Sequence, residues 1–81
     1  MFHVLILNSR PEGKDLVFYD GQSSTVSLPG KDGEFEILDF HKPIISLLKK
    51  GLILVDNQLE LGIKGGVAKM SRQSLVVVVD T

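Results

Sequence analysis

The chain has 81 residues, a formal net charge of −1, no cysteine and 43% hydrophobic residues. This length allows one small domain, and the absence of cysteine excludes disulfide bonds and thiolate metal sites. The Lys and Arg residues are scattered and no apolar run reaches the roughly 18 residues of a spanning helix, which argues against nucleic-acid binding and membrane insertion.

The first third of the chain predicts three short strands. Phe2 to Leu7 is apolar and ends at a loop rich in turn-forming residues. Leu16 to Tyr19 is a second run, and Asp20-Gly21 signals a turn. Ser24 to Leu28 follows as a third run with β-branched residues at its centre. Short strands separated by turn signals are typical of an all-β domain.

The middle of the chain continues the β pattern. The segment Pro29 to Gly33 is typical of a loop, and Glu34 to Ile37 alternates polar and apolar residues as a half-buried strand does. Pro43 to Leu48 fits either a strand or a short helical turn, because so short a segment does not separate the two periodicities. Gly51 to Val55 predicts a further strand, which ends at the turn Asp56-Asn57.

A hairpin is predicted around two consecutive glycines. Gly65-Gly66 fits a two-residue turn in which both positions need a positive φ angle. This turn would pair Lys64 with Val67 and Ile63 with Ala68. Because cross-strand partners share a face, the turn fixes which side chains of both strands point inward.

A second turn is predicted at Arg72-Gln73, which would pair Met70 with Leu75. The inward-facing residues of the last third would then be Leu61, Ile63, Ala68, Met70, Leu75, Val77 and Val79. Val76 and Val78 are left on the outer face. They fit either ordinary strand formers on a wet surface or a subunit interface.

These segments together predict one fold class. It is all-β, a small antiparallel β-sandwich of roughly eight to ten short strands, formed by a single domain over residues 1–81.

Few segments suggest chemistry. The sequence lacks the zinc-protease, serine-hydrolase, dithiol and phosphate-loop motifs, and no helix pattern follows the Gly30 to Gly33 loop to hold a phosphate. A local acidic cluster fits a solvated strand face better than an acid/base pair or a cation site. Its members are Asp32, Glu34, Glu36 and Asp39.

The two histidines give little support for catalysis. His3 lies in the first predicted strand and fits a structural or surface role. His41 lies in a loop-like stretch, and no serine, cysteine or second histidine is near enough in sequence to suggest a dyad. The sequence therefore predicts no catalytic, metal or cofactor site.

One segment nevertheless resembles a known family. Gly33-Glu34-Phe35-Glu36-Ile37-Leu38-Asp39-Phe40-His41-Lys42-Pro43-Ile44-Ile45 is similar to the G-E-(L/F)-G-I-L-P-G-H-A-P-L-L segment of the epsilon subunit of the rotary F-type ATP synthase. Further similarity lies at Phe2-His3, Val26 to Glu34, Ile63 to Val67 and Val77 to Asp80. The resemblance spans nearly the whole chain and implies an epsilon-type β-sandwich domain.

The resemblance implies two contact regions and one structural turn. The residues that align with the edge facing the polar loops of the membrane-embedded c-ring are Asp32, Gly33, Glu34 and Glu36. The residues assigned to the gamma subunit, the central shaft of the rotor, are His41, Phe40, Val76 and Val78. The resemblance supplies His41, whereas Phe40 stands at a departure from the family and Val76 and Val78 are added from the strand pattern. Carboxylates at the ring would act as rim electrostatics, and Phe40 would act as an exposed aromatic anchor. The glycines of the structural turn are Gly65 and Gly66.

The sequence also departs from the family. Asp39-Phe40 stands where the family has Pro-Gly, and Glu36 stands where it has Gly. Phenylalanine takes glycine's left-handed conformations only at a cost, so the turn into His41 is expected to take a different conformation. The given sequence stops at Thr81, before the family's two C-terminal helices, so neither self-inhibition nor nucleotide sensing by those helices is expected.

The predicted function is that of a non-catalytic rotor subunit, which couples the gamma subunit to the c-ring. It implies no cofactor, no nucleic acid and no small-molecule substrate. It also implies a peripheral position on the cytoplasmic face of a bacterial plasma membrane, or else on a plastid thylakoid. The alternatives are an unrelated β-sandwich module that binds a peptide or carbohydrate, and a small hydrolase using His41.

Overall fold

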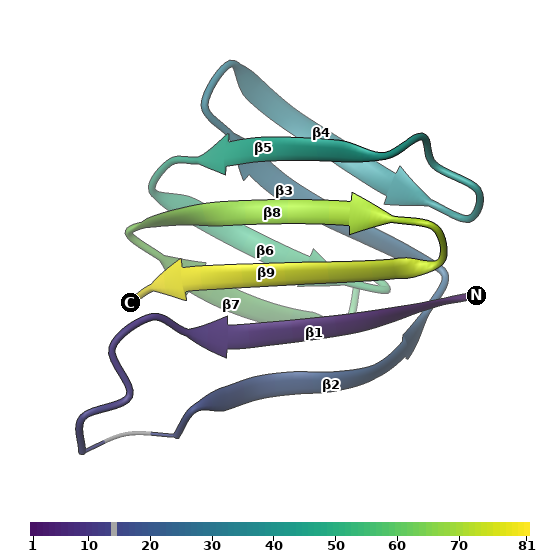
Figure 1. Cartoon of the computed structure of the whole chain (residues 1–81). Helices are drawn as coiled ribbons and strands as arrows, with labels where there is room; N and C mark the ends of the chain where they lie inside the picture. Colours follow the sequence, from purple (N-terminus) through teal and green to yellow (C-terminus); the bar gives the residue numbers. More distant parts are fainter. Residues whose placement is uncertain (14) are drawn as a thin grey trace.

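The computed structural model describes residues 1–13 and 15–81 and contains nine strands (Figure 1). They are β1 (Phe2–Asn8), β2 (Val17–Ser23), β3 (Thr25–Gly30), β4 (Gly33–Leu38), β5 (Ile44–Leu48), β6 (Gly51–Val55), β7 (Leu59–Ile63), β8 (Gly65–Ser71) and β9 (Ser74–Asp80). The described residues contain no helix, which confirms the all-β prediction. The segment Pro43 to Leu48, which fitted either a strand or a helical turn, contains the strand β5.

The strands form one sheet that is folded into two layers. The hydrogen-bonded order is β2-β1-β9-β8-β5-β3-β6-β7, with β4 paired to β3. In Figure 1 the first five of these strands lie in front and the others behind. We call β2, β1, β9, β8 and β5 the front layer, and β4, β3, β6 and β7 the back layer. They meet where Gly30 pairs with Leu48, and the Lys31 amide donates to the Leu47 carbonyl at 2.9 Å.

One pairing differs from the predicted antiparallel arrangement. β1 and β9 lie side by side in parallel, with Val4 opposite Leu75 and Ile6 opposite Val77. The other pairings among the described residues are antiparallel. Parallel neighbours need a long crossover connection, and here the strands between β1 and β9 in sequence supply it.

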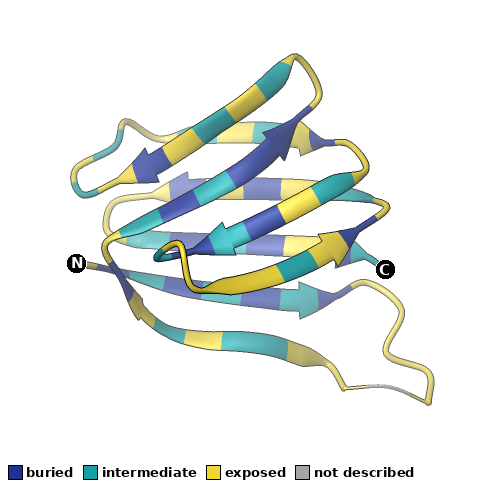
Figure 2. Cartoon of the chain, turned by 180° about the vertical axis from the view of Figure 1, so that it is seen from behind, coloured by how far each residue is buried: buried dark blue, intermediate teal, exposed yellow. Residues whose placement is uncertain are grey.

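The core lies between the two layers and follows the strand alternation. Buried residues recur at every second position along β1, β8 and β9, as the dark bands in Figure 2 show. The buried hydrophobic side chains are Phe2, Val4, Ile6, Val26, Leu28, Ile37, Leu48, Ile53, Val55, Ile63, Ala68, Met70, Leu75, Val77 and Val79. The inward orientation predicted for the last third of the chain is confirmed, and Leu61 packs against this core.

The predicted hairpin at Gly65-Gly66 is wrong. Neither glycine has a positive φ, and both belong to β8, where Gly66 pairs with Val79 of β9. β7 pairs with β6 and β8 pairs with β5 and β9, so β7 and β8 lie in different layers. A Cβ atom on Gly66 would lie 2.4 Å from the Val78 carbonyl oxygen. Glycine is therefore required for close backbone approach and not for a turn.

Two other turn predictions need adjustment. Asp20-Gly21 lies inside β2, where Asp20 pairs with Leu5 of β1, so the predicted turn is wrong. The predicted loop from Pro29 to Gly33 is reduced to the two residues Lys31 and Asp32, because strand pairing continues to Gly30 and resumes at Gly33. The second predicted hairpin is confirmed, since Met70 pairs with Leu75.

Candidate functional site

The predicted ring-facing residues gather at the β3–β4 hairpin. Asp32 lies in the turn, and Gly33 opens β4 with a φ of 135°, a backbone conformation that L side chains rarely adopt. Glu34 and Glu36 are exposed and lie opposite Pro29 and Ser27 of β3. The two carboxylates therefore share the outer face of the back layer, as their spacing predicted.

A third carboxylate joins them through the sheet. Ser27, which pairs with Glu36, also pairs with Leu54 of β6, and Leu54 pairs with Glu60 of β7. Glu60 therefore lies on the same outer face, which we call the acidic face and define by Glu34, Glu36 and Glu60. Alternation in β7 predicted that Glu60 points outward, but only the pairing of β3 with β6 places it beside the other two.

The acidic face is not purely charged. Leu38 and Leu52 are half exposed on the same side, at 49% and 50%. A shallow hollow beside Glu34 is lined by Lys49 and Lys50 of the β5–β6 connection. The surface can therefore offer carboxylates, leucine side chains and two ammonium groups to a polar partner.

The Asp39-Phe40 turn forms a second candidate region. The His41 amide donates to the Leu38 carbonyl at 3.2 Å and closes the turn. Phe40 has a φ of 62° and a side chain that is 86% exposed. The expectation that phenylalanine would avoid the left-handed conformation is wrong. For a bulky residue this conformation costs on the order of 1 kcal/mol, and strained residues of this kind cluster at functional sites.

Two residues outside the turn hold it in place. The Gln73 amide oxygen accepts a bond from the Phe40 backbone at 3.3 Å, and its nitrogen donates to Asp39 Oδ1 at 3.4 Å. The amino group of Met1 lies 2.7 Å from Asp39 Oδ1. Sequence reasoning missed both partners, because they lie far from the turn along the chain: Gln73 reaches it from the β8–β9 hairpin and Met1 from the residue before β1.

His41 is half-buried beside this turn. Its Nδ1 lies 2.7 Å from the backbone carbonyl of Lys42, to which it donates when protonated at that nitrogen. Asp39, the carboxylate closest in sequence, is held by Met1 and Gln73. This geometry gives no support to the hydrolase alternative. The described residues also contain no group of three or more His, Cys, Asp or Glu side chains placed to hold a metal ion.

Val76 and Val78 belong to a larger apolar surface. Val78 is 37% exposed on the outer side of β9, and its strand neighbours are Leu7 of β1 and Val67 of β8. We call this surface the apolar face. It comprises Leu5, Leu7, Val17, Ile45, Leu47, Val67, Val76 and Val78. The sequence predicted an outward position for Val76 and Val78, and the sheet order places the other members beside them.

The structure separates the predicted contact regions. The apolar face lies on the front layer and the acidic face on the back layer, so the core lies between them. Asp32 precedes β4 and Phe40 follows it, which places the hairpin and the exposed turn at opposite ends of that strand. Val76 and Val78 therefore lie on a different face from Glu34 and Glu36, whereas the hairpin residues Asp32 and Gly33 line a hollow together with Ile45 and Leu47 of the apolar face.

The carboxyl of Asp56 is affected by its surroundings at the start of β3. Backbone amides of Thr25 and Ser24 donate to its Oδ1 at 3.1 and 2.8 Å and hold the pKa of its carboxyl below the ordinary value. Since Asp56 follows β6 and Ser24 precedes β3, these bonds fasten two neighbouring strands of the back layer at one end.

Comparison with known proteins gives the family. A family model described as the β-sandwich domain of the ATP synthase delta/epsilon chain matches residues 13–81. The chain belongs to this family. Membership in the ATP synthase delta/epsilon family sets aside the unrelated binding module. The described part of the chain contains no helix that could cross a membrane.

Individual relatives agree with this assignment. The ATP synthase epsilon chain of Rhodopseudomonas palustris strain BisB18 is 32% identical over 65 residues, which cover 76% of this chain and 48% of the relative. That of Campylobacter curvus is 39% identical over 74 residues, covering 86% and 55%. The chain thus spans about half the length of these relatives.

A solved structure shares the fold of this delta/epsilon family member. A chain in the central stalk and c-ring assembly of the Tetrahymena thermophila mitochondrial ATP synthase superposes with a TM-score of 0.74 at 12% identity. The match covers 98% of this chain and 63% of that chain. At this identity the likeness shows the β-sandwich architecture alone.

Proposed function

We propose that this chain is a non-catalytic component of the central stalk of an F-type ATP synthase, where it couples the gamma subunit to the c-ring. The observation that carries the proposal is the match of the delta/epsilon β-sandwich family over residues 13–81. The proposal concerns what this β-sandwich does, since the chain spans about half of its relatives. It requires no cofactor and no small-molecule substrate.

The gamma subunit is proposed to bind at Phe40, His41 and the apolar face. Phe40 is largely exposed, and its backbone amide donates to the Gln73 side chain, which in turn donates to Asp39, so little backbone order has to be gained when a partner covers the ring. Aromatic anchors of this kind carry a large share of interface energy. Val76 and Val78 would add the apolar area that surrounds such an anchor.

The c-ring is proposed to meet the β3–β4 hairpin, through Asp32, Gly33, Glu34 and Glu36. The carboxylates are exposed, so their attraction to basic or amide side chains of the ring loops would be screened by salt. Contacts of this type fix register and partner choice more than affinity.

The mechanical role follows from the placement of the two regions. A turn that binds gamma and a hairpin that binds the ring would be joined by β4, which is hydrogen-bonded to β3 along its length. Close-packed β-sandwiches deform little, so torque applied at one end would reach the other without loss of register. The chain would be held on the cytoplasmic face of a bacterial membrane by these partners.

The proposal can be tested by binding to purified gamma subunit, with and without the c-ring. Phe40→Gly is the most informative variant, because glycine relieves the left-handed strain while removing the aromatic ring. We expect its affinity for gamma to fall by at least about tenfold, which corresponds to the loss of an anchor. Thermal unfolding should show an equal or higher midpoint.

Two further variants complete this experiment. His41→Ala should weaken gamma binding, and Glu34→Lys should leave gamma binding unchanged but weaken binding to the gamma–ring assembly at low salt. Failure of the wild-type chain to bind gamma at micromolar concentrations would refute the proposed function. Full gamma binding by Phe40→Gly would remove Phe40 from the interface.

A further inference from the structure

The apolar face is built from side chains that lie in register across the front layer. One row crosses all five strands, and its members are Val17, Leu7, Val78, Val67 and Leu47. A second row runs beside it, and its members are Asp20, Leu5, Val76, Lys69 and Ile45. The third row is polar and contains Gln22, His3, Ser74 and Ser71.

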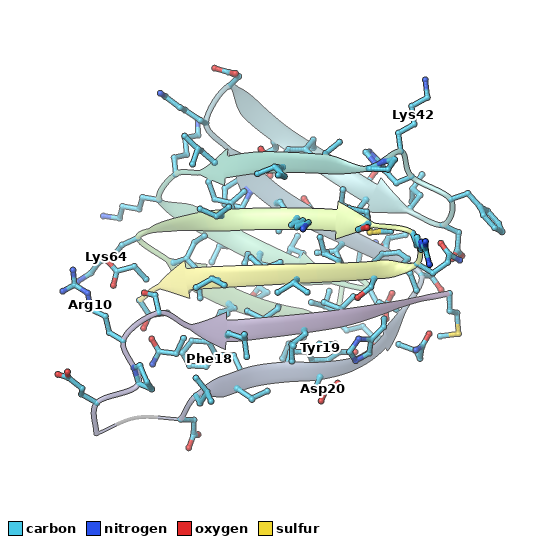
Figure 3. All side chains as sticks on the ribbon, in the orientation of Figure 1. Arg10, Phe18, Tyr19, Asp20, Lys42 and Lys64 are labelled. Atoms are coloured by element: carbon cyan, nitrogen blue, oxygen red, sulfur yellow. The ribbon has the colours of Figure 1, made fainter. Side chains whose placement is uncertain are left out.

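The second row carries one charge of each sign. Asp20 lies on β2 at the border of the layer, where Figure 3 shows it, and its Oδ1 is 2.6 Å from His3 Nε2. Lys69 lies on β8, three strands away in the order β2-β1-β9-β8, and it is exposed. The residues between them in the row are Leu5 and Val76.

We propose that a second copy of this chain packs on the apolar face, related by a two-fold axis that runs along the strands between β1 and β9. This operation places β2 of one copy over β8 of the other, and β1 over β9. It keeps each row aligned with the same row of the partner. Asp20 then lies over Lys69 of the other copy, and the second such pair forms symmetrically.

Every row obeys the same complementarity. In the first row Leu7 meets the other copy's Val78, and Val17 meets its Val67. In the third row, polar side chains meet polar side chains. A self-complementary patch of this kind is what an isologous dimer requires, and aligned packing of two sheets at about 10 Å is a common arrangement.

The area of contact between the two copies limits the affinity of the dimer. β1, β2, β8 and β9 each have 7 residues. Four strands of this length cover an area roughly 19 Å wide and 23 Å long. This is below the about 800 Å² per partner of a stable interface, so the dimer is weak and forms in the micromolar to millimolar range. The dimer covers Val76 and Val78, so it excludes the gamma contact proposed for these two residues. Its test uses the purified chain alone and does not depend on the proposed rotor function.

Charge reversal tests this geometry by sedimentation equilibrium of the purified chain. Asp20→Lys and Lys69→Asp each replace two attractive pairs by two like-charge pairs, and each should raise the dimer dissociation constant by about tenfold or more. An equimolar mixture of the two variants should recover the wild-type constant. In the mixed dimer, position 20 of each copy again faces a charge of opposite sign at position 69 of the other.

Controls keep the outcome interpretable. Lys31→Asp makes the same charge change as Lys69→Asp in the β3–β4 turn, outside the four strands β1, β2, β8 and β9 that overlap in the dimer, and should leave the dissociation constant unchanged. Circular dichroism should show that all variants remain folded. A wild-type chain that is monomeric up to about millimolar concentration overturns the proposal. So does a dimer whose stability is unaffected by the single variants or is not recovered in the mixture.

Discussion

The two outer faces of this sandwich are built from the same strand alternation but offer different chemistry. On the front layer, outward positions of β1, β9, β8 and β5 are mostly leucine, isoleucine and valine. On the back layer, outward positions include Glu34, Glu36 and Glu60 together with half-exposed leucines. Burial in the core therefore does not explain which residue types occupy either face, since both faces point away from the core.

The difference indicates two kinds of partner. An apolar face loses unfavourable contact with water when it is covered, whichever partner covers it. A carboxylate face gains little from burial and acts through charge, which is sensitive to salt. The front layer is thus suited to stable packing against protein, and the back layer to oriented, salt-dependent contact.

The largest expected effect separates the apolar face from the core beneath it. Val77→Asp buries an unpaired charge at a fully buried position and should destabilise the domain by at least about 3 kcal/mol. Val78→Asp, one residue along β9, should cost no more than about 1 kcal/mol because Val78 is partly exposed. Urea unfolding measures both. Equal destabilisation by the two variants would contradict the assignment of an outer face.

A second comparison concerns close backbone approach in the two layers. Gly66→Ala puts a methyl group 2.4 Å from the Val78 carbonyl oxygen, so β8 and β9 must move apart. We expect a loss of about 2 kcal/mol in unfolding free energy, as for other overpacked sites. Gly62→Ala in β7 is the matched control, since its nearest contact is Leu52 Cδ2 at 3.8 Å. A neutral Gly66→Ala variant would argue against this strand pairing.

The stability of the back layer should respond to pH through Asp56. The folded-state pKa of its carboxyl is lowered from 3.8, so its stabilisation is complete above that value and is lost as pH falls through the lowered pKa. Asp56→Asn should be less stable by about 1 kcal/mol at neutral pH. The difference from wild type should vanish in acid. Thermal unfolding as a function of pH measures this, and a difference that persists in acid would exclude a charge effect.

The smallest effect on stability is expected on the acidic face itself. Glu34→Lys and Glu36→Lys change exposed side chains and should alter the unfolding free energy by less than about 0.5 kcal/mol. The salt dependence of c-ring binding should nevertheless reverse or disappear. Ring binding measured at two salt concentrations checks this, with Glu12→Lys in the β1–β2 loop as a control for net charge.

Much of the fold was open to prediction because strands carry a local signal. Alternation identified the buried set Ala68, Met70, Leu75, Val77 and Val79 even though the turn used to derive part of it was wrong. The predicted inward orientation is still correct because Ile63 and Ala68 are buried by the alternation within their own strands, whichever strands they pair with. The turn prediction at Gly65-Gly66 failed because glycine is favoured both in tight turns and where two backbones lie very close together.

The candidate site was less predictable than the fold. Phe40, His41 and the hairpin carboxylates could be named from the sequence. The hydrogen bonds that join Gln73 to Phe40 and Asp39 could not. Nothing local in Gln73 distinguishes it from any other turn residue. Its role depends on the β8–β9 hairpin reaching the end of β4.

The sequence by itself determined that this chain is all-β, which strand residues of its last third are inward, and to which family it is similar. These properties depend on periodicity and short motifs, which are local. Only the tertiary structure decided that β1 and β9 run in parallel, that β7 and β8 belong to different layers, and that apolar and acidic residues gather on opposite faces. Those outcomes depend on which strands become neighbours, and this is fixed by packing between segments far apart in the chain.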